Sequence, residues 1–148
     1  MKLVIQRSLS SSVSVNGKIV GKIDKGLVVL VSFTYKDDEK VIDYMINKVL
    51  NLRIFGDENG IMNKSVKDID GKILSISQFT LYADCKKGNR PSYINALKSD
   101  EAIKLYDIFN SKLKKKIEVQ TGIFGSDMKV NITNDGPVTI ILERWWKW

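Results

Sequence analysis

Histidine is absent from this chain of 148 residues, and Cys85 is its only cysteine. Without histidine the chain cannot form a Ser-His-Asp triad or a Cys-His pair, and it has no histidine general base or histidine metal ligand. A single cysteine excludes an intramolecular disulfide and a cysteine-rich zinc site. We therefore expect no metal site, and any catalysis must depend on other groups.

Long hydrophobic runs are also missing. No stretch approaches the roughly 20 apolar residues of a membrane-spanning helix. The apolar run after Lys2 is far too short for the hydrophobic region of a signal peptide. These features predict a cytoplasmic protein with no membrane partner, and the single cysteine suits a reducing compartment.

Basic residues outnumber acidic ones, 24 Lys and Arg against 17 Asp and Glu, for a net charge of +7. Such an excess of lysine often reflects solubility alone. It is also the electrostatic footprint of a domain that binds a polyanion, RNA above all. The charge by itself leaves both interpretations open.

A chain of this length predicts one domain over residues 1–148, with a Trp- and Lys-rich extension at 144–148. Asn16-Gly17 between two β-prone runs indicates a hairpin, and the apolar run 26–33 indicates a central strand buried on both faces. Apolar residues at helical spacing after Asp37 or Asp38 predict a helix that ends near Asn51. The fold class is thus α+β, a strand-rich domain with two main helices. The other strands are expected at 2–7, 12–15, 18–23, 71–81, 117–121, 128–134 and 138–143, and the second helix at 100–116.

Polar side chains interrupt the end of the apolar run 71–81. In a strand, Ser77 and Phe79 would share one face, and Gln78 and Thr80 would share the other. An edge strand with a solvated face would account for this pattern. A segment that presents hydroxyls and an amide to a ligand would account for it equally.

Two further segments are rich in glycine. Pro137, one of only two prolines, follows Gly136 between two β-prone runs, so it belongs to an edge strand, a turn or a bulge. Gly122 and Gly125 surround Phe124 and allow either a bulge or the close approach of a ligand to the backbone.

Taken together, these segments resemble one family. Ser77-Gln78-Phe79-Thr80 and the pattern Asn-x-Gly-Pro-x-Thr at 134–139 are similar to the paired motifs of the D-aminoacyl-tRNA deacylases. The resemblance extends over nearly the whole chain and includes Gln6-Arg7, the segments 53–55 and 88–92, Met62-Asn63, and Thr121-Gly122-x-Phe124.

The resemblance implies a barrel-like sheet in a homodimer whose active site lies at the subunit interface. Members of this family hydrolyse the ester between a D-amino acid and the terminal adenosine of tRNA, without an organic cofactor. The Gly136-Pro137 peptide would be cis and would reach into the partner's site, with Arg7 supporting its backbone. Rigid backbone at that position rejects any L side chain by steric exclusion, although glycine, which has no side chain, would escape rejection.

The resemblance also assigns roles around the strand motif. Ser77, Gln78 and Thr80 would form the catalytic segment, in which backbone amides stabilise the oxyanion and the 2′-OH of the terminal ribose assists. Gln78 would lie near the ester and offer its own N–H, while Thr80 would position the substrate, because no basic partner is evident to make it a nucleophile.

Binding of the tRNA end is implied for two other groups of residues. Phe79, Phe124, Gly125 and Met128 would hold the adenosine, although Met128 could equally be an ordinary core residue. Lys86, Lys87 and Arg90 would contact phosphates of the acceptor stem.

Two other functions stay open at this stage, a non-catalytic RNA-binding domain and a small-molecule esterase. The tail Trp145-Trp146-Lys147-Trp148 could stack on RNA, grip a partner subunit or pack on its own domain.

Overall fold

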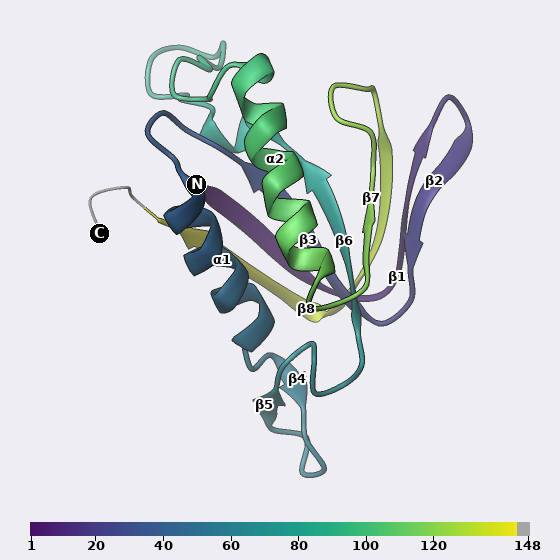
Figure 1. The fold of residues 1–148 in the computed structure, drawn as a ribbon. Helices are drawn as coiled ribbons and strands as arrows, with labels where there is room; N and C mark the ends of the chain where they lie inside the picture. Colours follow the sequence, from purple (N-terminus) through teal and green to yellow (C-terminus); the bar gives the residue numbers. More distant parts are fainter. Residues whose placement is uncertain (145–148) are drawn as a thin grey trace.

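A computed structural model describes residues 1–144 of the chain (Figure 1). The prediction for the tail at 145–148 lies outside the described residues.

A curled sheet forms the centre of the fold. In the path β2-β1-β3-β6-β7, β3 and β6 are parallel, as are β6 and β7, and β8 pairs antiparallel with β1 along its length. The sheet curls so far that a Cβ added to Gly21 in β2 would lie 2.6 Å from the carbonyl oxygen of Thr121 in β7. The sheet is therefore nearly closed and barrel-like. Its strands are β1 (Lys2–Val15), β2 (Lys18–Ile23), β3 (Gly26–Ser32), β6 (Lys72–Ser77), β7 (Val119–Thr121) and β8 (Lys129–Glu143).

Two helices, α1 (Glu39–Asn51) and α2 (Ser99–Lys114), lie on the same side of this sheet (Figure 1). The side chain of Asp38 caps α1 by accepting a hydrogen bond from the Val41 N–H at 3.0 Å. The predicted start and end of this helix are confirmed. The second helix begins one residue earlier and ends two residues earlier than the pattern predicted.

Apolar side chains form two clusters, one on each side of β3. The larger cluster packs both helices against the sheet, and the smaller one fills the inside of the curl. Strand β3 contributes Leu27, Val29 and Val31 to the larger cluster and Val28 to the smaller one, which confirms the prediction of a central strand buried on both faces.

The prediction of a strand over 71–81 is wrong at its end. Strand β6 stops at Ser77, and residues Phe79–Tyr82 form the short 3₁₀ helix η1. The alternation that placed Ser77 with Phe79 and Gln78 with Thr80 therefore does not exist. The reason is tertiary: Ser77 pairs with Val31 near the end of β3, so little partner strand remains beyond it. The edge-strand interpretation also fails for this segment, because residues 79–82 do not form a strand.

Other elements also differ from the sequence-based expectation. The strands expected at 2–7 and 12–15 join into β1, and those expected at 128–134 and 138–143 join into β8. Register shifts between Gln6 and Ser10 mark where both long strands bend. A small hairpin of β4 (Phe55–Gly56) and β5 (Met62–Lys64) was not predicted as strands.

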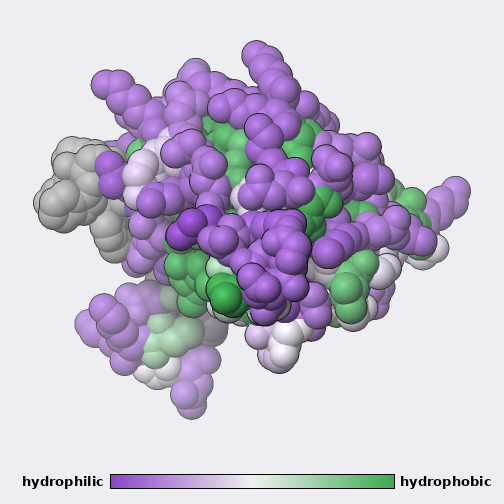
Figure 2. Space-filling model, turned by 90° about the horizontal axis from the view of Figure 1, so that it is seen from below, coloured by the Kyte–Doolittle hydropathy of each residue, from purple (hydrophilic) through white to green (hydrophobic). Residues whose placement is uncertain are grey.

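The surface seen from below in Figure 2 is mostly hydrophilic, with hydrophobic side chains in separate small areas. Among residues 1–144, no helix is long and apolar enough to cross a bilayer.

Candidate active site

A cleft of about 650 Å³ opens where β6 and β7 part. The last pair between these strands joins Ser75 to Thr121. Beyond it, β6 continues to Ser77 against β3, while the chain after β7 turns away. Residues 76–79 line one side of the cleft and residues 124–128 line the other. The sheet therefore brings the strand motif and the second glycine-containing segment together, although they lie far apart in the sequence.

Hydrogen bonds fix the strand motif in place beside the cleft. The Gln78 N–H donates to the Val31 carbonyl oxygen at 2.7 Å, and the Gln78 side-chain amide donates to the Thr80 hydroxyl. Ser77 and Gln78 line the cleft, whereas Thr80 is not among its lining residues. The expectation that the Gln78 N–H serves as an oxyanion donor is wrong in this structure, because that N–H already has a backbone partner.

Aromatic side chains form the mouth of the cleft. Phe79 is 57% exposed, and its ring meets that of Tyr93 edge to face at a centroid distance of 5.0 Å. Phe124 and Met128 face them from the other wall, and Gly125 at φ +79° makes the turn between these two. Met128 also packs against the smaller apolar cluster, so it belongs to the core and to the cleft at once.

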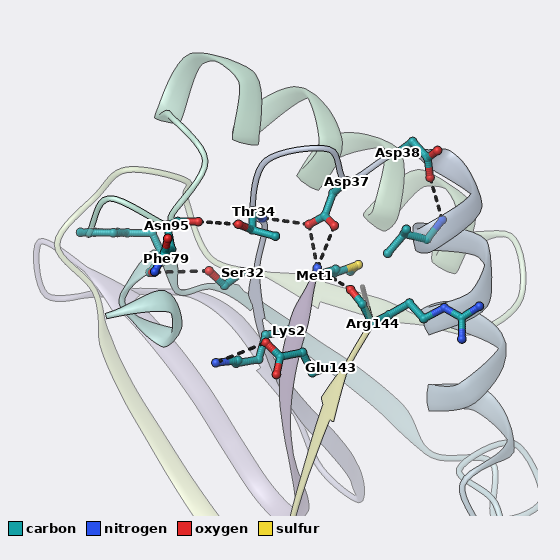
Figure 3. Close-up of polar contacts among 11 residues, drawn as sticks. Met1, Lys2, Ser32, Thr34, Asp37, Asp38, Phe79, Asn95, Glu143 and Arg144 are labelled. Carbon is teal, nitrogen blue, oxygen red and sulfur yellow. Dashed lines mark hydrogen bonds and ion pairs between the residues drawn. The ribbon is translucent and has the colours of Figure 1, made fainter. Parts of the chain in front are cut away.

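Phe33 and Tyr35 line the cleft, and a buried ion pair anchors the chain next to them (Figure 3). The Asp37 carboxylate lies 2.8 Å from the Met1 ammonium group and accepts the Thr34 N–H, also at 2.8 Å. The Thr34 hydroxyl donates to the Asn95 carbonyl oxygen, and the Ser32 hydroxyl donates to that of Phe79 at 3.3 Å. These bonds tie this segment to η1 and to the loop that carries Tyr93.

Burial dominates the titration of this ion pair. It lowers the pKa of the Met1 ammonium group and raises the pKa of the Asp37 carboxyl group. The hydrogen bond between the two groups opposes both shifts. The pair therefore organises the chain next to Phe33 and Tyr35 at the cost of removing two charges from water.

Gly136 and Pro137 lie outside the cleft of their own chain. The peptide bond between them is cis, and both residues are exposed on β8. Arg7 donates to the Asp135 carbonyl oxygen at 3.2 Å and to that of Ile54 at 2.8 Å. Arg7 pairs with Leu27 of β3, and Ser77 pairs with Val31 of the same strand. These two positions of β3 are four residues apart, which is about 13 Å along the strand.

The three cations expected to contact phosphates lie in an exposed loop between η1 and α2. Backbone bonds of 2.7 and 2.9 Å between Asp84 and Ser92 close this loop. Lys86, Lys87 and Arg90 are all exposed on it and none of them lines the cleft.

Several residues that line the cleft were not predicted as site residues from the sequence, namely Tyr35, Tyr93, Ile94, Lys98 and Ser99. Tyr93 follows directly after the loop motif at 88–92, and this adjacency could have indicated it. The others belong to no local pattern and reach the cleft only through the fold. Among the described residues, no group of three or more His, Cys, Asp or Glu side chains could hold a metal ion.

Comparison with known structures identifies the fold first. A structure described as a probable eukaryotic D-amino acid tRNA deacylase superposes with a TM-score of 0.82 at 17% identity, over 95% of this chain and 97% of that one. A second structure, of a c-Myc DNA Unwinding Element Binding Protein, has a TM-score of 0.93 at 41% identity, over 97% of this chain and 99% of that one.

Comparison with family models identifies the class of enzyme. The model for D-Tyr-tRNA(Tyr) deacylase matches residues 4–143. The chain belongs to this family, whose members are hydrolases of the aminoacyl-tRNA ester bond. The resemblance seen in the sequence motifs is thereby confirmed.

Proposed function

We propose that this protein cleaves the ester of D-aminoacyl-tRNA to free tRNA and a D-amino acid. It would act as a proofreading enzyme in the cytoplasm, and the whole chain would form one domain. One observation carries the proposal. The cleft unites Ser77, Gln78 and Phe79 with Phe124, Gly125 and Met128, the two segments that carry family motifs on either side of one cavity.

The aromatic mouth suits the terminal adenosine. Phe79 offers an exposed ring face, and Phe124 offers a second aromatic surface across the cleft. Stacking on aromatic side chains is the usual way for a protein to hold an unstacked base. The adenine would occupy this mouth, with the ester directed toward Ser77 and Gln78.

The chemistry then requires no side-chain base. We assign oxyanion stabilisation to the Phe79 N–H, because Phe79 lines the cleft and the Gln78 N–H is bonded to Val31. Preorganised backbone donors act where negative charge develops and need no proton transfer of their own. The 2′-OH of the terminal ribose assists the attack by water, and an aminoacyl ester is activated enough for such a site. No metal or organic cofactor takes part.

Chiral selection is assigned to a second copy of the chain. Gly136 and Pro137 are exposed on an edge strand, remote along the sheet from Ser77. A homodimer in which this corner enters the partner's cleft would give each site a rigid backbone wall, steadied by Arg7 through the Asp135 carbonyl. Such a wall would exclude L side chains but would admit glycine, so glycyl-tRNA would also be cleaved.

Longer-range binding of tRNA is assigned to the exposed loop. Lys86, Lys87 and Arg90 would meet phosphates of the acceptor stem, which makes affinity depend on salt. The net charge of +7 favours the same partner.

A second candidate function is nucleic-acid binding without catalysis. It is favoured by the 41% identical relative described as a DNA unwinding element binding protein. The cleft argues against it as the sole function, because nucleic-acid binding alone gives no reason for Ser77 and Gln78 to sit in a cavity beneath aromatic rings.

Purified protein should hydrolyse D-Tyr-tRNA(Tyr) and spare L-Tyr-tRNA(Tyr), with release of labelled tyrosine measured against spontaneous hydrolysis. Binding of uncharged tRNA and of duplex DNA is measured in parallel. Equal hydrolysis of both esters, or of neither, contradicts the proposal. Binding without any hydrolysis would support the second candidate.

A further inference from the structure

Tyr106 of α2 contacts both Ser75, where β6 and β7 part, and Phe124 in one wall of the cleft. Its hydroxyl donates to the Ser75 carbonyl oxygen at 2.8 Å, and the Ser75 hydroxyl donates back to it at 3.3 Å. Its ring packs against that of Phe124, with centroids 5.8 Å apart. One side chain thus contacts the strand that leads to Ser77 and the loop that carries the opposite wall.

The polar contact is fully buried. Ser75 is 0% exposed and Tyr106 is 4% exposed. Buried carbonyl and hydroxyl groups require partners, and Tyr106 supplies one to each of these groups of Ser75. Removing the phenol hydroxyl would leave the Ser75 carbonyl without that donor at the last pair between β6 and β7.

A second buried tyrosine provides the contrast. Tyr82 is 7% exposed, and its hydroxyl has no hydrogen-bond partner among the described residues. Burial of a phenol in this fold therefore does not by itself supply its hydroxyl with a hydrogen-bond partner. The bonds of Tyr106 to Ser75 are a specific feature of the cleft.

The phenol of Tyr106 remains a donor at neutral pH. Burial raises its pKa above the ordinary tyrosine value, and hydrogen bonding of the Ser75 and Asn110 side chains lowers it only in part.

We propose that Tyr106 is a positioning residue, which sets the width of the cleft by holding β6 at Ser75 and the ring of Phe124 at a fixed separation. The inference rests on the deacylation proposed above. Tyr106 does not line the cleft and would act through these two contacts. Without its hydroxyl, residues 77–79 would shift relative to Phe124, so the ester would be misplaced although the tRNA end still bound.

The test compares Tyr106→Phe with Tyr82→Phe in the full-length protein, using D-Tyr-tRNA(Tyr) under conditions where circular dichroism shows each variant to be folded. Tyr106→Phe is expected to lower kcat by about tenfold with KM within about twofold of the parent. Tyr82→Phe is expected to keep the parental kcat. Ser75→Ala should lose less activity than Tyr106→Phe, because it preserves the bond from the phenol to the backbone. An unchanged kcat in Tyr106→Phe, or an equal loss in Tyr82→Phe, would overturn the proposal.

A second measurement is independent of turnover. Amide hydrogen exchange should become faster at residues 77–80 and 123–128 in Tyr106→Phe, and should stay unchanged there in Tyr82→Phe. If the parent protein cleaves no D-Tyr-tRNA(Tyr), the proposed function fails while the exchange comparison still decides whether Tyr106 holds the two walls. Equal exchange in both variants would overturn the positioning role even where the parent protein is active.

Discussion

At the scale of single residues, the strand motif brings backbone groups and neutral polar side chains to the cleft. Gln78 illustrates this, since its N–H and its side-chain amide are both engaged, with Val31 and Thr80 respectively. The Thr80 hydroxyl accepts from that amide. No basic side chain is hydrogen-bonded to Thr80 in the described part of the chain, so nothing there would activate it as a nucleophile.

Thr80→Ala is therefore expected to keep substantial deacylase activity. Losing one hydrogen bond that positions Gln78 should lower kcat/KM by about tenfold or less. Single-turnover and steady-state hydrolysis of D-Tyr-tRNA(Tyr) measure this change. Thr80→Ser, which keeps the hydroxyl, is the matched control. A complete loss in Thr80→Ala, with normal tRNA binding, would restore Thr80 as a nucleophile.

At the scale of elements, the ends of strands and helices carry more information than their middles. The end of β6 was misjudged from sequence because Phe79, Thr80 and Leu81 are β-prone residues, and only the shortage of partner strand turns them into η1. The start of α1 was predicted correctly because its cap is local. Asp38 reaches the Val41 N–H three residues later, within the same turn.

Asp38→Ala should lower the free energy of unfolding by about 1 kcal/mol, because the Val41 N–H loses its acceptor at the helix start. Asp38→Asn should keep most of the stability, since asparagine caps helices about as well as aspartate. Urea unfolding followed by circular dichroism measures both variants. Equal losses in the two variants would show that the carboxylate charge matters rather than the cap.

At the scale of the whole molecule, the site is divided between distant parts of the sheet. The cleft includes Val130 near the start of β8, while Gly136 and Pro137 lie six and seven residues further along the same strand, outside the cleft. A single chain therefore presents the binding cavity and the proposed selecting corner on different surfaces. This separation is the structural argument for a homodimer in the proposed function.

The stability of the whole molecule should fall as the pH rises above about 10. Burial raises the pKa of both Tyr82 and Tyr106 above the ordinary value of 10.0, most strongly for Tyr82, where the nearby charges of Asp37 and Glu143 add to the shift. In that range the unfolded chain releases these protons and the folded chain keeps them. The unfolded state then binds fewer protons, so each tyrosine lowers the free energy of unfolding by up to about 1.4 kcal/mol per pH unit.

Urea unfolding between about pH 9 and pH 11 measures this slope. Tyr82→Phe removes one titrating group without removing a hydrogen bond, so its slope should be shallower than that of the parent by one proton. Equal slopes would contradict the burial of an un-ionised Tyr82 phenol.

The sequence by itself determined the fold class, the start of α1, the buried character of β3 and the family. Each of these depends on local information: helical spacing with a capping carboxylate, a continuous apolar run, and short motifs in a recognisable order. The absence of histidine also restricted the chemistry, because it removed the imidazole group that most often serves as a general base.

Only the tertiary structure decided where the site residues lie relative to one another. It placed Ser77 and Phe124 on opposite sides of the cleft that opens where β6 and β7 separate. It also engaged the Gln78 N–H in a backbone hydrogen bond and kept Gly136 outside the cleft. It also made Tyr106, a residue within the second predicted helix, the contact between Ser75 and Phe124. The physical reason is that strand pairing and hydrogen-bond satisfaction join residues far apart along the chain, and no local pattern records which partners they will meet.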